Sequence, residues 1–289
     1  MLKYDFSFAE AAIQWLETGD VAHMKTLESL AATQHIFNHA QQFNPNTSTE
    51  SKAQFLMELL PLQNKALVPQ VKQNIAYAKQ HIMGDNKITT IVLQYLPVGF
   101  AFNGTLFFTF GYDIGVAFGE NCSLNLAHCK FIENPQEMVY YAIHELHHTG
   151  FIKIEGHMPS LQITTHREMA TIVAYLIHLE GMGTYAPLSI RQQENAMHTD
   201  NDYIALQDEE KVRDFAKEVA SVYRYFTQTP EAILTPNDWG KLNILAGEAR
   251  GSYIAGAYMA QTIDKTHGRE ALVQLISRPS HEFIETYLP

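Results

Sequence analysis

The sequence predicts a mainly α-helical protein with one small β-sheet, an α+β fold, and three observations support this prediction. Segments with apolar residues at helical spacing lie toward both ends of the 289-residue chain. Between them, from 87 to 131, lie short segments rich in β-branched and aromatic residues and punctuated by glycines. Hydrophobic residues make up 46% of the sequence and charged residues only 18%, which predicts a sizeable buried core.

Residues 5–83 are expected to be helical. The first helix has one apolar face, marked by Phe8, Ile13 and Leu16. The stretch NPNTSTES (44–51) is the clearest loop, and Thr49 or Ser51 is expected to cap the helix that follows it.

The strand-rich region predicts three or four strands. The segments are KITTIVLQYL (87–96), TLFFTFG (105–111), IGVAFG (114–119) and CSLNLAHC (122–129). The last of these alternates polar and apolar residues, as a strand with one solvated face does.

A helix is expected from about 135 to 149. Asn134 is a good N-cap, Pro135 suits the first helical position, and Glu137 can close a capping box. Gly150 is the expected stop. Apolar residues surround this helix almost completely, so it is predicted to be buried.

Helices are expected again after residue 152. The strongest segments are 164–182, 208–227, 237–249 and 250–266, whereas 189–203 is expected to be a loop or lid. We therefore divide the chain into an N-terminal helical region (1–86), a small sheet with its buried helix (87–150) and a C-terminal helical region (151–289).

Charge and cysteine content exclude several classes of protein. Lys and Arg number 20 against 31 Asp and Glu, a net charge of −11, which argues against nucleic-acid binding. No basic run suggests a membrane surface, and no window approaches the ~18 apolar residues of a membrane span. The N-terminus lacks the pattern of a signal peptide, so we expect a cytoplasmic protein. Cys122 and Cys129 are too few for a disulfide framework, and their spacing matches no common zinc pattern.

The buried helix carries the motif H-E-x-x-H, formed by His144, Glu145 and His148. Residues four apart on a helix differ by only ~40° around its axis, so both imidazoles can reach one ion. Glu145 then lies beside the ion, where it can act on a bound water. Without a metal, each unsatisfied buried polar group costs on the order of 1–3 kcal/mol, so the motif predicts a Zn²⁺ site. The other nearby histidines are expected to pack or hydrogen-bond rather than bind metal: His147, His157, His166, His178 and His198.

A catalytic zinc needs a third protein ligand and an open position. The metzincin pattern fails, because Phe151 and Ile154 stand where it requires Gly and His. Two downstream carboxylates remain. Glu168, near a helix start, has an alternative role facing the helix dipole. Glu180 follows the apolar run ATIVAYLIHL, where a buried carboxylate needs a partner, so we favour Glu180 and keep Glu168 as the alternative.

HELHHTGF (144–151) followed by LEGMGTY (179–185) resembles bacterial families of zinc-dependent peptidases within the broader gluzincin group. The two ends of the chain are similar to the same group, although only the two central motifs are specific. The resemblance implies one zincin-like catalytic unit with His144, His148 and Glu180 as ligands and Glu145 as general base. It also implies that CSLNLAH is the edge strand lining the cleft.

A gluzincin-like site also has a Tyr or His donor for the oxyanion, and Tyr253 in GSYIAGAYMA is the candidate, with ordinary packing as its alternative role. The expected partner is a peptide or protein substrate. Two other functions stay open: a helical interaction protein with a structural or lost zinc site, and a metal-dependent hydrolase of a non-peptide bond. The intact Glu145 argues against the first, because a structural site needs no base.

Overall fold

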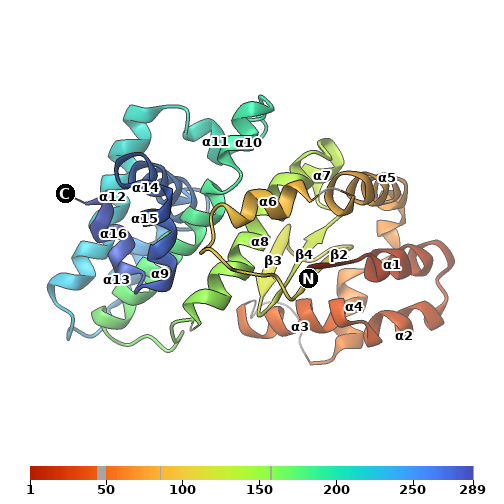
Figure 1. The fold of residues 1–289 in the computed structure, drawn as a ribbon. Helices are drawn as coiled ribbons and strands as arrows, with labels where there is room; N and C mark the ends of the chain where they lie inside the picture. The colour runs from red at the N-terminus through yellow and green to blue at the C-terminus, as the bar shows by residue number, and fades with distance from the viewer. Residues whose placement is uncertain (44–49, 85, 157, 289) are drawn as a thin grey trace. The chain divides into compact units, whose positions relative to one another are not determined.

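The computed structural model describes residues 1–43, 50–84, 86–156 and 158–288 (Figure 1). The chain divides into two compact units, each described here by itself. The first holds residues 1–90 and 101–149, and the second holds residues 91–100 and 150–289. Most of the predicted loop, including Thr49, lies outside the described residues. The cap predicted at Ser51 is confirmed, since its hydroxyl accepts a hydrogen bond from the Gln54 N–H at 3.2 Å.

The first unit begins with a short strand, continues as helices and then forms a small sheet. Its N-terminal elements are β1 (Lys3–Asp5), α1 (Ser7–Thr18), α2 (Val21–Ser29), α3 (Ala31–Phe43), α4 (Lys52–Leu59), the 3-10 helix η1 (Leu62–Leu67), α5 (Val68–Ala78), the π-helix η2 (Lys79–Met83) and α6 (Lys87–Leu93). The remaining elements are β2 (Thr105–Thr109), β3 (Gly115–Phe118), β4 (Asn121–Asn125), α7 (Cys129–Glu133) and α8 (Glu137–Glu155). The last residues of α6 and α8 belong to the second unit.

The sheet has four strands in the order β1-β2-β4-β3. Strands β1, β2 and β4 are parallel, with Leu106 of β2 opposite Cys122 of β4. Strand β3 runs antiparallel to β4, with Gly115 opposite Leu124. The prediction of a mainly helical protein with a small sheet is confirmed. The prediction that CSLNLAH is the edge strand is wrong, because β4 lies between β2 and β3, and β3 is the edge strand on this side of the sheet.

The β3–β4 ribbon presents a different face to each of two helices. Side chains alternate across a strand, so Gly115 and Cys122 share one face and Phe118 lies on the other. The first face meets α8, where Cys122 lies near Thr149 and Gly115 near Glu145. The second face meets α3, whose His35 ring lies 6.4 Å from the ring of Phe118. The sheet therefore forms the supporting layer against which the H-E-x-x-H helix packs.

The second unit is built almost entirely of helices. They are α9 (His166–Tyr185), α10 (Leu188–Gln193), α11 (Asn201–Ala205), α12 (Glu209–Gln228), α13 (Pro236–Gly240), the 3-10 helix η3 (Lys241–Ile244), α14 (Gly251–His267), α15 (Arg269–Gln274), the 3-10 helix η4 (Leu275–Ser277) and α16 (His281–Tyr287). Across the described ranges of both units, none of the helices has the length and apolar character that a membrane crossing requires.

Helices α9 and α14 cross at two glycines. A Cβ on Gly181 would lie 2.5 Å from the carbonyl carbon of Gly256, and one on Gly256 would lie 2.5 Å from the Ile177 carbonyl oxygen. Real Cβ atoms do not approach backbone that closely, so this contact requires glycine on both helices. The small residues of GSYIAGAYMA thus allow a close helix approach, which holds α14 beside the residue that follows Glu180.

Three secondary-structure predictions are corrected. KITTIVLQYL does not form a strand: α6 occupies Lys87–Leu93, because Ile88 and Val92, four residues apart, bury one helical face. The segment 237–249 is broken into α13 and η3 rather than one helix. The expected loop at 189–203 contains parts of α10 and α11, and it buries the side chain of Arg191.

Candidate metal centre

Helix α8 carries the H-E-x-x-H motif and extends further than its sequence indicates. It starts at Glu137, two residues after the predicted first helical position, although the Asn134 side chain accepts a hydrogen bond from the Gln136 N–H at 3.2 Å. Its predicted end is wrong, because Gly150 lies inside the helix. A Cβ at Gly150 would stand 2.5 Å from Leu96 Cδ1, so this glycine serves close packing rather than termination. The terminating glycine is Gly156, at φ +81°, directly after the last helical residue.

His144 and His148 lie one turn apart on the same helix. Their ring centroids are 4.2 Å apart and their planes are inclined by 74°. His144 is half-buried and His148 is buried. The two imidazoles thus share one helix face, as two ligands of a single ion must.

A third possible ligand comes from α9. His144, His148 and Glu180 each offer one ligand atom, and these atoms lie within 4.8 Å of one another. Among the residues that the structure describes, this is the group of His, Cys, Asp or Glu side chains suited to hold a metal ion. Within the second unit, the ring of Phe151 on α8 lies 4.7 Å from that of His178 on α9. Two imidazoles and one carboxylate form a donor set that catalytic zinc uses.

Glu168, the alternative third ligand, is occupied at the start of α9. Its Oε2 accepts hydrogen bonds from the backbone N–H groups of Thr164 and Thr165, at 2.8 and 2.9 Å. These backbone bonds, together with those from the threonine hydroxyls, lower the pKa of Glu168 to about 2. Glu168 and Thr165 form a capping box. The alternative role proposed from the sequence, a carboxylate at a helix start, is the one observed.

The side chain of Glu145 extends from α8 toward strand β3. Only 5% of its surface is exposed. A Cβ on Gly115 would stand 2.5 Å from Glu145 Oε1, so the carboxylate rests against the bare Cα of β3. Burial is the main cause that raises the pKa of the Cys122 thiol, and the negative charge of Glu145 raises it further. The backbone carbonyl of Glu145 accepts a hydrogen bond from Thr149 Oγ1 at 3.0 Å.

Two of the other histidines that follow the motif have hydrogen-bond partners on other elements. His166 Nδ1 lies 2.9 Å from Thr229 Oγ1, and His178 Nδ1 lies 3.2 Å from Ser280 Oγ. His147 is fully buried on α8, and His198 is exposed. His157 lies outside the described residues. None of the described four belongs to the possible metal-binding group.

Tyr253, the candidate oxyanion donor, is half-buried in the first turn of α14. The guanidinium carbon of Arg250 lies 3.7 Å from the centroid of its ring. Arg250 Nε in turn donates to both carboxylate oxygens of Asp202, at 2.7 and 2.8 Å. Arg250 has a φ of +49°, a conformation that costs a non-glycine residue free energy. A strained arginine held by a buried aspartate therefore fixes the Tyr253 ring.

Sequence reasoning missed three residues of this arrangement: Gly115, Asp202 and Arg250. A signal existed for Gly115, because an isolated glycine inside a strand pattern often marks a close backbone approach. Asp202 and Arg250 lie 48 positions apart, and nothing in the sequence relates them.

Comparison with known proteins gives one informative match. A family model described as "putative zinc dependent peptidase" matches residues 14–288, which include both central motifs. No match is found among curated proteins or among solved structures. The resemblance to a family of zinc-dependent peptidases, inferred from HELHHTGF and LEGMGTY, is therefore confirmed over nearly the whole chain.

Proposed function

The chain belongs to the family of putative zinc-dependent peptidases, and from this premise we propose that it is a metallopeptidase of gluzincin type. His144, His148 and Glu180 are the proposed zinc ligands, and Glu145 is the proposed general base. The observation that carries the proposal is the proximity of the three ligand atoms, within 4.8 Å of one another. Each atom comes from one of the two sequence motifs that resemble the family.

The donor set supports zinc as the metal. Imidazole nitrogen and carboxylate oxygen are both zinc ligands, and three protein ligands leave the fourth tetrahedral position for water or substrate. A Zn²⁺ ion held by His144, His148 and Glu180 would supply a bound water with a pKa of about 7 and would polarise a carbonyl group. The chain's own residues would supply the three ligand atoms, two from α8 and one from α9.

Glu145 is placed to move a proton rather than to bind the metal. It follows His144 by one residue, so its side chain leaves the helix ~100° away from the ligand face. Gly115 supports the carboxylate from the side of β3, and burial excludes bulk water. In the proposed reaction Glu145 accepts a proton from the attacking water and donates it to the nitrogen of the leaving amine.

Tyr253 is the proposed donor to the oxygen that gains negative charge when the carbonyl carbon becomes tetrahedral. Its position near Glu180 is supported by the crossing of α9 and α14, because Gly181 meets Gly256 three residues after Tyr253. The Arg250 guanidinium over the ring limits the rotation of the phenol.

The edge strand favours a peptide substrate over another class of ester or amide. Strand β3 pairs with β4 on one side and is the last strand of the sheet formed by the described residues. An extended peptide can add to such an edge by main-chain hydrogen bonds. Gly115 is the first residue of β3 and contacts Glu145, so a peptide aligned on β3 would pass the proposed base.

Two other functions are separated from this proposal by simple outcomes. If the protein is a helical interaction protein with a structural zinc, it should bind metal but hydrolyse no peptide. Substitution of Glu145 should then change neither the metal content nor the fold. A metal-dependent hydrolase of a non-peptide bond predicts metal-dependent turnover that a peptide pool does not reveal.

The direct test is metal content combined with metal-dependent peptide cleavage. Elemental analysis of protein purified without chelators should find about one Zn²⁺ per chain. Chelation should abolish cleavage of a peptide pool, followed by mass spectrometry, and added Zn²⁺ should restore it. Protein that holds no transition metal, even after reconstitution, would refute the proposal.

A further inference from the structure

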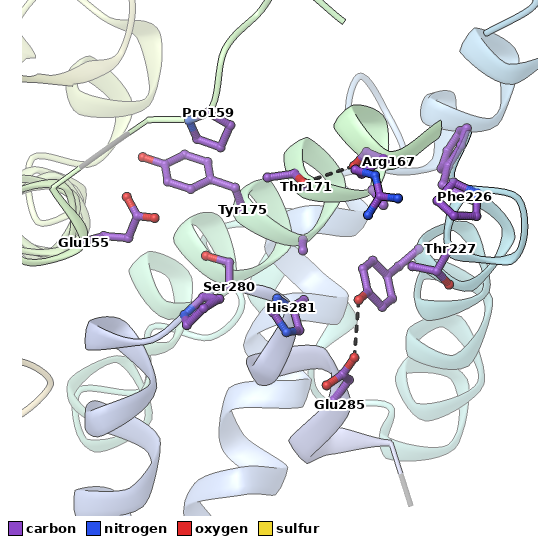
Figure 2. Close-up of a pocket in the computed structure, with 15 residues that line it drawn as sticks. Glu155, Pro159, Arg167, Thr171, Tyr175, Phe226, Thr227, Ser280, His281 and Glu285 are labelled. Carbon is purple, nitrogen blue, oxygen red and sulfur yellow. Dashed lines mark hydrogen bonds between the residues drawn. The ribbon is translucent and has the colours of Figure 1, made fainter. Parts of the chain in front are cut away.

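A second concave site lies within the helical second unit, and none of the three proposed metal ligands lines it (Figure 2). It is a pocket of about 490 Å³, a size typical of sites for small ligands. One face of α9 forms a wall, with Ala170 and Ala174 leaving room where larger side chains would fill it. Residues of α12 and α16 form the other walls, among them Phe226 and His281.

The two ends of the pocket carry opposite charge. Glu155, the last residue of α8, lies at one end in Figure 2, and the Tyr175 hydroxyl points toward it. Burial is the main cause that raises the pKa of Tyr175, and the negative charge of Glu155 raises it further. The two groups therefore lie close together. Arg167 lies at the other end in the same view. This distribution suits a ligand with a cation at one end and an anion at the other.

Arg167 can accept such an anion at little cost. Its guanidinium pairs with Glu231, but the two side chains are 65% and 78% exposed. Ion pairs this exposed contribute little stability, so a ligand carboxylate can replace Glu231. The planar guanidinium also matches a carboxylate with two parallel hydrogen bonds.

The separation of the two ends sets the length of the ligand. Arg167 and Tyr175 are eight residues apart on α9, which corresponds to ~12 Å along the helix. A single amino acid cannot span this distance, whereas an extended chain of about four residues can. The apolar middle of the pocket suits small side chains, and Glu155 together with Glu285 disfavours polyanions such as nucleotides.

We propose that this pocket binds a free, extended peptide of about four residues, with its amino group at Glu155 and its carboxylate at Arg167. Such a peptide has the chemistry of a peptidase product, but the proposal does not depend on the proposed function, because binding is measured without turnover.

Isothermal titration calorimetry with tetra-alanine tests the proposal on the full chain, in the Glu145→Gln background so that the peptide survives. Amidation of the peptide's carboxylate should weaken binding by ~10-fold or more, as should Arg167→Gln, because each removes the same charge-assisted hydrogen bonds. The two changes combined should weaken binding no further. Acetylation of the peptide's amino group and Glu155→Gln should each weaken binding in the same way, and the two changes combined should weaken it no further.

Thr171→Phe tests the location of the binding site independently. Thr171 is exposed and lines the middle of the pocket, so a phenyl ring at this position would fill the pocket. Ser221→Phe on α12 is the matched control: it is exposed, does not line the pocket, and its hydroxyl also bonds to a backbone carbonyl of its own helix. Tetra-alanine should bind the control and not Thr171→Phe, with thermal unfolding checking that both variants fold. Three outcomes would overturn the proposal. The first is that tetra-alanine binds equally well when its amino group is acetylated and its carboxylate amidated. The others are that both Phe variants bind it equally well, or that no saturable binding is found in the ~1 mM range.

Discussion

The carboxylate of Glu145 lies against the Cα of Gly115, so closely that a Cβ at residue 115 would stand 2.5 Å from Oε1 and 2.8 Å from Cδ. Only glycine lets the edge strand pass the proposed base at this distance. The contact joins two features that the sequence presents separately, a motif on a helix and a glycine in a strand.

Gly115→Ala should therefore displace the Glu145 carboxylate while leaving the fold nearly intact, because the obstructing atoms are the far end of a flexible side chain. We expect peptide hydrolysis to fall ~10²-fold, since misplacement of a catalytic group by about 1 Å costs this much. Zinc content should not change. Gly240→Ala is the control, because a Cβ there meets no atom within 4 Å. Wild-type turnover in Gly115→Ala would show that the contact does not position the base.

The two candidate third ligands predict opposite results. Glu180→Ala should lower zinc affinity by orders of magnitude, as expected when one of three protein ligands is lost. Glu168→Ala should keep its zinc but lower the melting temperature, because it removes the capping box at the start of α9. Zinc analysis and thermal unfolding of both variants measure this difference. Zinc loss in Glu168→Ala alone would reverse the assignment.

Tyr253 and Arg250 should behave as one unit. Tyr253→Phe removes the proposed oxyanion donor and should lower kcat by ~10²-fold. Arg250→Gln removes the stacking on the ring and the pair with Asp202, and should lower kcat in the same direction. The double variant should lose little beyond Tyr253→Phe alone, since coupled residues are not additive. Additive losses of kcat would mean that Arg250 acts independently of Tyr253. An unchanged kcat in Tyr253→Phe would show that Tyr253 has only a packing role.

His35 should make the fold sensitive to acid. Burial lowers its pKa to about 4, opposed by its hydrogen bond to the Val116 backbone. Between pH 4 and the ordinary value of about 6.5, the unfolded chain therefore binds more protons than the folded chain. The stabilising contribution of neutral His35 is complete above about pH 6.5 and is lost progressively as the pH falls toward 4.

Urea unfolding at several pH values measures this effect. His35→Gln should flatten the pH dependence of the unfolding free energy in this window, by as much as about 1.4 kcal/mol per pH unit. The same substitution at exposed His198 is the control. An equally steep dependence in His35→Gln would show that other groups cause the acid sensitivity.

Local patterns predicted the parts of the site that lie within single helices. H-E-x-x-H pointed to His144, Glu145 and His148 because one helical turn brings them together, and the apolar run ATIVAYLIHL favoured Glu180 because a buried carboxylate needs a partner. The sequence could not place Gly150 inside a helix, because its requirement comes from Leu96, a residue distant in the chain. The capping role of Glu168 was foreseen as an alternative because it depends only on its neighbours.

The errors in the fold share one cause, which is that tertiary packing overrides local preference. The β-branched run of KITTIVLQYL favours a strand, yet α6 forms because Ile88 and Val92 bury one face of a helix. The short strand β1 was missed because its three residues acquire their structure from pairing with β2. The family resemblance implied that CSLNLAH is the edge strand, but strand order depends on pairing contacts, and these place β4 between β2 and β3.

Glu145→Gln tests the central claim most directly, because it removes the basic oxygen and preserves the shape of the side chain. Zinc content and hydrolysis of a peptide pool should be measured on the same preparation near neutral pH. We predict a variant that holds as much zinc as the wild type and melts at the same temperature, while its turnover falls by ~10²–10⁴-fold. A zinc-loaded Glu145→Gln protein that hydrolyses the pool at the wild-type rate would contradict the account.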